Sequence, residues 1–156
     1  MPDNEQGEAR RELLGQLAEL AAGFLAAEGD AYDLDWLMLP LETVDAGVLM
    51  YGPEGKVIAM NGEAEAILGI KFPRWQAMSP DEQANMLRME MPDGRPILLE
   101  QAPRPRALRG EATYGFPMVV RRGDGSRVMI VVSAVPVRDP ANRVIGAVTW
   151  LERAAE

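Results

Sequence analysis

Residues 44 to 69 read VDAGVLMYGPEGKVIAMNGEAEAILG, a pattern that predicts a strand, a tight turn, a second strand and a short helix. The run 48–51 is apolar and strand-like. It is followed by Gly52-Pro53-Glu54-Gly55, which offers a Pro for the second turn position and a Gly for positive φ. The chain is therefore expected to reverse there, and residues 56–60 to form the returning arm of a hairpin.

A helix is expected to begin directly after this hairpin. The side chain of Asn61 can accept a backbone N–H at a helix start, and the small and acidic residues after it suit the positive end of the helix dipole. Gly69 is a natural left-handed terminator. The helix should therefore be only about two turns long.

Three later strands are expected near residues 116–122, 128–137 and 144–148. The second of them alternates with a two-residue period, yet both of its faces are mostly apolar. One face would pack on the helices of the domain, so the other also needs a cover. A second subunit could supply this cover, and the need for it therefore favours a homodimer. An N-terminal helix folded back on its own sheet would cover the face as well.

The order and spacing of these segments resemble the PAS domain family, over about residues 42 to 152. The segment 105–111 is similar to the helix and turn that precede the last three strands in bacterial members. The resemblance implies an α+β fold, with a five-stranded antiparallel sheet and helices on one face. It also implies a sensory or interaction domain of a bacterial signal-transduction or regulatory protein, acting on a downstream effector that the residues do not identify.

The N-terminal segment predicts an amphipathic helix over residues 8 to 28. Its apolar stripe supplies the candidates for a dimer interface: Leu13, Leu17, Leu20 and Phe24. The alternative is a helix packed on its own domain. Residues 1–41 thus form a helix and an apolar connector for dimerisation or capping, 42–152 the sensor domain, and 153–156 a tail. The connector, residues 30–43, is expected to lie against the sheet or a partner subunit.

Composition limits the partners and the location of this 156-residue chain. Its net charge of −8 argues against binding to nucleic acid or to an anionic membrane, since both need clustered cations. Its N-terminus is polar and acidic, and no apolar run approaches the length that spans a bilayer. We therefore expect a cytoplasmic protein.

The chain contains no His and no Cys, which excludes classical catalytic triads and ordinary zinc sites. The same absence excludes two specialisations of the resembling family, the cysteinyl-flavin adduct and haem held by His; any other cofactor stays open. We expect no metal site and no catalysis. The remote alternative is a small α+β enzyme with an apolar substrate, for which Tyr51 and Tyr114 are the only candidates to lie inside a cavity.

The resemblance places a set of apolar residues where a ligand cavity or plain core would lie. Met and aromatic side chains make an adaptable lining for a small apolar ligand such as a fatty acid or a ring system, yet they can also fill the space completely. In that case the domain would be a ligand-independent dimerisation scaffold. The pocket candidates are Met50, Met60, Phe72, Trp75, Met78, Met118, Val131, Val148 and Trp150.

Three arginines close together, Arg104, Arg106 and Arg109, could receive an anionic group or the acidic face of a partner. The favoured alternative is an exposed helix that balances a very acidic chain.

Overall fold

The computed structural model describes residues 2–26 and 40–154, and most of the apolar connector therefore lies outside the described residues. None of the described helices is long and apolar enough to cross a membrane. In chain order the elements are α1 (Pro2–Ala26), β1 (Gly47–Tyr51), β2 (Val57–Met60), α3 (Gly62–Leu68), α4 (Phe72–Gln76), α5 (Pro80–Leu87), η1 (Leu99–Gln101), α6 (Pro103–Leu108), β3 (Thr113–Arg121), β4 (Arg127–Arg138) and β5 (Val144–Arg153).

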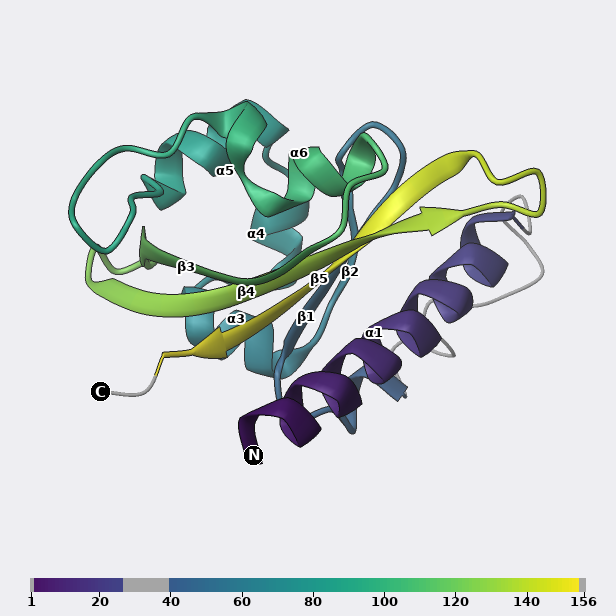
Figure 1. Cartoon of the computed structure of the whole chain (residues 1–156). Coiled ribbons are helices and arrows are strands. Elements are labelled where there is room, and N and C mark those ends of the chain that lie inside the picture. The colour runs from purple at the N-terminus through teal and green to yellow at the C-terminus, as the bar shows by residue number, and fades with distance from the viewer. Residues whose placement is uncertain (1, 27–39, 155–156) are drawn as a thin grey trace.

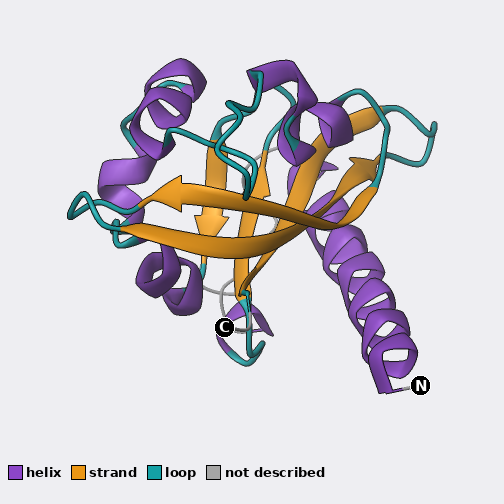
Figure 2. Cartoon of the chain, turned by 60° about the vertical axis from the view of Figure 1, so that its left-hand side comes forward, coloured by secondary structure: helices purple, strands orange, loops and turns teal. Residues whose placement is uncertain are grey.

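The five strands form one antiparallel sheet, as predicted, and their order is β2-β1-β5-β4-β3. The first strand therefore pairs with the last in the middle of the sheet, with Val48 opposite Trp150. Both faces are covered. Figure 1 shows α4, α5 and α6 on one side of the sheet and α1 on the other, and Figure 2 shows the same separation from a second side.

The two faces carry separate apolar cores because neighbouring residues of a strand point to opposite sides. Leu49 and Tyr51 belong to the inner core, beneath the helices α3 to α6. Val48 and Met50 belong to the outer core, which α1 covers. The sequence-based prediction of an apolar outer face in need of a cover is confirmed, and the helix of the same chain supplies that cover.

Asn61 joins the hairpin to helix α3, and its side chain is 1% exposed. Its Oδ1 accepts hydrogen bonds from the backbone N–H groups of Ala64 and Val48, both at 2.9 Å. Its Nδ2 donates to the carbonyl oxygens of Leu41 and Ala46, also at 2.9 Å. The predicted helix cap is therefore present, and it also holds the entry to β1.

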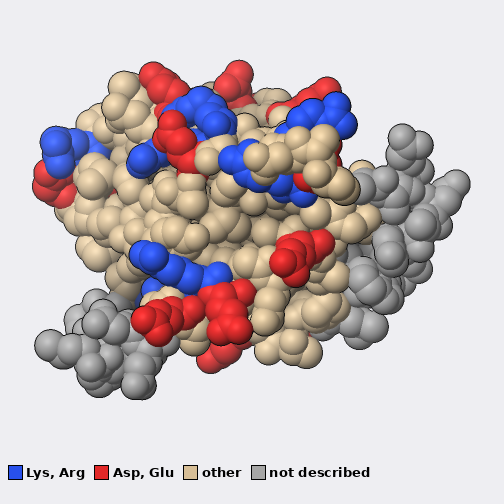
Figure 3. Space-filling view, turned by 45° about the vertical axis from the view of Figure 1, so that its right-hand side comes forward, with Lys and Arg blue, Asp and Glu red and all other residues tan. Residues whose placement is uncertain are grey.

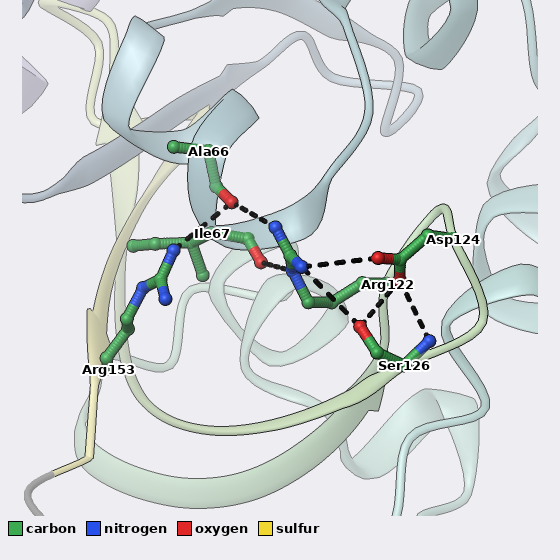
Figure 4. A network of polar contacts seen from close by, with 6 residues as sticks. All are labelled: Ala66, Ile67, Arg122, Asp124, Ser126 and Arg153. Carbon is green, nitrogen blue, oxygen red and sulfur yellow. Dashed lines mark hydrogen bonds and ion pairs between the residues drawn. The ribbon is translucent and has the colours of Figure 1, made fainter.

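The β3–β4 turn is fastened to the C-terminal end of α3 (Figure 4). The guanidinium of Arg122 donates to the carbonyl oxygens of Ala66 and Ile67, at 2.8 and 3.0 Å. Arg153, at the end of β5, donates to Ala66 at 3.3 Å. Cations here offset the negative end of the helix dipole. The contacts tie one end of the inner core together.

Candidate functional site

A cavity of about 70 Å³ lies between the inner sheet face and the helices α4 to α6. Its floor is formed by buried strand residues such as Leu49, Val132 and Leu151, and Trp75 closes it from α4. The side chains of Leu87 and Leu99 are only half-buried and form its outer rim. The volume is small beside the about 300–1,000 Å³ of pockets that hold drug-sized ligands.

Four polar side chains line this otherwise apolar space, each from a different element: Tyr51 from β1, Gln83 from α5, Arg104 from α6 and Thr149 from β5. The Arg104 guanidinium carbon lies 5.1 Å from the centre of the Tyr51 ring. Its Nη1 donates to Gln83 Oε1 at 2.8 Å. Gln83 is 1% exposed, and its Nε2 donates to the carbonyl oxygen of Trp75 at 2.9 Å. Gln83 therefore fixes Arg104 beside the phenol.

The Tyr51 phenol is buried, and burial raises its pKa above the ordinary 10.0. The Arg104 guanidinium and, to a smaller extent, the Thr149 hydroxyl lower the pKa without offsetting the burial. The phenol therefore keeps its proton at neutral pH, where it can donate a hydrogen bond and is not a base.

Two residues that line the cavity, Trp75 and Thr149, each carry a buried polar atom, Nε1 and Oγ1, with no hydrogen-bond partner among the described residues. Thr149 lies close enough to Tyr51 to affect its pKa, but forms no hydrogen bond of ordinary geometry. Leaving a buried polar group unpaired costs about 1–3 kcal/mol. In the described ranges, no group of three Asp or Glu residues is arranged to hold a metal ion.

The structure distributes the pocket candidates over both faces of the sheet. Trp75 and Met118 line the cavity. Met60, Phe72 and Met78 belong to the same inner core without lining it. The remaining candidates do not face the cavity. Met50, Val148 and Trp150 lie in the outer core against α1. Val131 stands between the inner-core residues Ile130 and Val132, so its side chain is on the outer side of the sheet.

No local sequence pattern groups the four polar side chains of the cavity, because each comes from a different element. Of the two tyrosines expected as candidates for the enzyme alternative, Tyr51 lines the cavity, whereas Tyr114 is 39% exposed beneath the guanidinium of Arg11. The arginine cluster divides: Arg106 pairs with Glu111 at 3.3 Å, and Arg109 donates to the Glu100 carbonyl. Arg104 alone of the three lines the cavity.

Helix α1 packs its predicted stripe on the outer face of its own sheet. Leu17 is buried there, while Leu13, Leu20 and Phe24 are partly buried against the same core. Figure 3 shows acidic and basic side chains interspersed on the face in view, with a broad band without charged residues across its middle. That face carries no extended basic surface of the kind that binds nucleic acid.

A sequence model described as the PAS fold matches residues 41–153, which include the whole sheet and all the cavity walls. The chain belongs to the PAS family. No curated protein matches its sequence.

Solved structures of PAS domains share the fold at low sequence identity. The PAS domain of a Colwellia psychrerythraea protein is 16% identical, with a TM-score of 0.56 and coverage of 78% of this chain and 96% of that one. The PAS domain of an HTR-like protein from Haloarcula marismortui is 15% identical, with a TM-score of 0.55 and coverage of 78% and 91%. The LOV domain of a blue-light activated histidine kinase from Erythrobacter litoralis is 13% identical, with a TM-score of 0.55 and coverage of 72% and 99%.

Proposed function

We propose that this PAS domain is a non-enzymatic sensor of a bacterial regulatory protein, which binds a small molecule in the cavity between the sheet and helices α4 to α6. It works in the cytoplasm as a homodimer. The ligand favours one arrangement of the sheet and α1 over another, and the dimer geometry reports the change. Such a shift requires that the ligand bind the two arrangements with different affinity.

The observation that carries the sensing proposal is the unpaired polar atoms on the cavity wall. Trp75 and Thr149 line the cavity, and their buried polar atoms, Nε1 and Oγ1, lack a partner among the described residues. Buried polar groups in folded proteins are normally hydrogen-bonded, so such atoms call for a partner that enters the cavity. If the space served packing alone, apolar side chains would line it at a lower cost in folding free energy.

A ligand-independent dimerisation scaffold is the competing function. It is favoured by the small volume of the cavity, about 70 Å³, and by the buried state of most of the side chains around it. In that case the cavity would hold water or nothing, and substitutions in its wall would alter stability without altering any response.

The homodimer proposal is supported by apolar side chains that α1 leaves uncovered. Met129 of β4 is 44% exposed, and alternation with the buried Ile130 places it on the outer side of the sheet. Tyr114, beneath Arg11 of α1, is 39% exposed. A second subunit lying on this side of the sheet would bury both side chains, which supports the homodimer.

Native mass spectrometry of the purified protein tests both parts, because it reports the subunit count and any retained small molecule together. A dimer with an added mass supports the sensor, and a bare dimer favours the scaffold. Met129→Glu is expected to weaken the dimer, whereas Leu98→Glu, which charges a 56% exposed side chain elsewhere, is the matched control. A monomer in the unsubstituted protein would overturn the homodimer.

A further inference from the structure

Resting on the proposed sensing role of the cavity, we propose that its ligand is a small carboxylate with a short apolar body. The carboxylate is bound by the Arg104 guanidinium together with the Tyr51 and Thr149 hydroxyl groups, and the body lies among the apolar walls.

Arg104 brings a positive charge to the cavity. Its side chain is half-buried at the cavity, and no carboxylate of the described residues lies within 4.0 Å of it, since it takes part in none of the ion pairs there. One of its five N–H groups donates to Gln83 and the guanidinium also interacts with the Tyr51 phenol, so the other N–H groups have no carboxylate partner in the described part of the chain. A partly desolvated cation is stabilised most by an anion, and a guanidinium pairs with a carboxylate through two parallel hydrogen bonds.

The neighbours of Arg104 in the cavity wall include hydroxyl groups. The Tyr51 phenol is close enough to the Arg104 guanidinium for the positive charge to lower the phenol pKa. Burial has the larger effect and raises that pKa, so the phenol stays protonated. The Thr149 hydroxyl beside it is buried and unpartnered. Guanidinium, phenol and hydroxyl groups can therefore all donate hydrogen bonds in one region, and the guanidinium can only donate. A ligand group that only accepts, as an ionised carboxylate does, fits this region better than an amide or an alcohol.

The size of the cavity limits the ligand to a short apolar body. A cavity of about 150 Å³ holds benzene. The cavity of this domain, with about 70 Å³, therefore has room for an apolar body of a few carbon atoms. The walls around that body, including Leu49, Met118 and Ile130, are apolar and buried. Short monocarboxylates such as propionate and butyrate meet both conditions, because they join one anionic group to a small apolar chain.

The test compares propionate with propionamide, which has nearly the same shape but no charge, by calorimetric titration of the full chain at constant ionic strength. Propionate is expected to bind about tenfold or more tightly than the amide, as charge-assisted hydrogen bonds exceed neutral ones. Arg104→Gln should abolish this preference. Arg106→Gln, on the same helix but paired with Glu111, is the matched control and should keep it.

Thr149→Val gives a second variant that keeps the side-chain shape, and it should weaken propionate binding several-fold. Equal binding of acid and amide, or a preference that survives Arg104→Gln, would overturn the carboxylate while leaving a ligand-binding cavity. A broader negative result would overturn the sensing role together with the carboxylate. In that result, propionate, propionamide, butyrate and butyramide would all fail to bind at millimolar concentration, and native mass spectra would show no retained mass.

Discussion

The Arg10 guanidinium of α1 binds the Glu152 carboxylate of β5 in a bidentate ion pair, with Nε 2.9 Å from Oε1 and Nη2 3.0 Å from Oε2. The Nε1 of Trp150 donates to the same carboxylate at 2.7 Å. The two charged side chains are 27% and 33% exposed, so water screens them only in part. This contact links the N-terminal helix directly to the last strand, beside the outer core where Leu17 is buried.

Glu152→Gln is expected to loosen α1 from the sheet. The amide oxygen can still accept from Trp150, but the charge that pairs with Arg10 is lost. We expect the free energy of unfolding to fall by about 1 kcal/mol, near the upper end for partly exposed pairs because the geometry is bidentate. Amide hydrogen exchange in α1 should accelerate more than exchange in the sheet.

The matched control is Glu111→Gln, which breaks the more exposed pair with Arg106, where the side chains are 54% and 37% exposed. Its cost in urea unfolding should be less than about 0.5 kcal/mol. Equal costs for the two substitutions, with unchanged exchange in α1, would show that the Arg10–Glu152 pair does not hold the helix.

Asn61→Ala should be among the most destabilising single changes outside the apolar cores. It removes four hydrogen bonds of a side chain that is 1% exposed, and leaves backbone groups at β1 and α3 unpaired. We expect a loss of about 3 kcal/mol in urea unfolding. Asn61→Asp should also destabilise the fold strongly. It replaces the Nδ2 donor with a carboxylate oxygen, which would face the carbonyl oxygens of Leu41 and Ala46 without a hydrogen bond.

Ser79→Ala is the matched control for the capping function alone. Ser79 caps α5 through Glu82, at the surface, and its loss should cost about 1 kcal/mol. If Asn61→Ala cost no more than Ser79→Ala, the Asn61 side chain would be a helix cap only, without a role in holding the start of β1.

Local features of the fold could be predicted because short-range chemistry determines them. The turn before Gly55, the Asn61 cap and the Gly69 terminator each depend on residues within one or two turns of chain. Gly55 and Gly69 indeed have positive φ, at 84° and 68°. The alternating pattern of β4 likewise identified a sheet with two apolar faces.

The division of residues between the two faces could not be predicted in the same way. Alternation separates Leu49 from Met50, but when both sets are apolar it does not say which set meets the helices and which meets α1. Met50, Val148 and Trp150 were therefore pocket candidates although they lie in the outer core. The polar lining of the cavity depends on four elements far apart in the chain, and no local pattern brings Tyr51 and Arg104 together.

Thr149→Val is expected to stabilise the ligand-free protein while it weakens ligand binding. The substitution keeps the shape of the side chain and removes a buried hydroxyl that has no partner in the described residues. The gain in the free energy of unfolding should be about 1 kcal/mol in urea titrations.

Thr113→Val is the control for this effect, because the Thr113 hydroxyl is also buried and unpartnered there but does not line the cavity. Both variants should gain stability, and only Thr149→Val should change binding. A loss of stability in Thr149→Val alone would indicate that the hydroxyl is already satisfied without a ligand.

The stability of the protein should fall at alkaline pH partly through Tyr51. Its pKa in the folded state is raised by burial above the ordinary 10.0, so the folded protein keeps this proton to higher pH than the unfolded chain does. The contribution to stability is therefore complete below about pH 10 and is lost as the pH rises further. Tyr51→Phe should remove that loss, so its urea midpoint should decline less steeply between about pH 9 and 11.

The comparison needs a variant that loses one hydroxyl outside the cavity. Tyr114→Phe serves, because that ring is 39% exposed on the surface. The difference in unfolding free energy between the two variants should widen as the pH rises, because only Tyr51→Phe removes the buried phenol beside Arg104. Curves that stayed parallel across this range would mean that the Tyr51 phenol ionises as freely in the folded protein as in the unfolded chain, and so that it is not held as a donor beside the guanidinium.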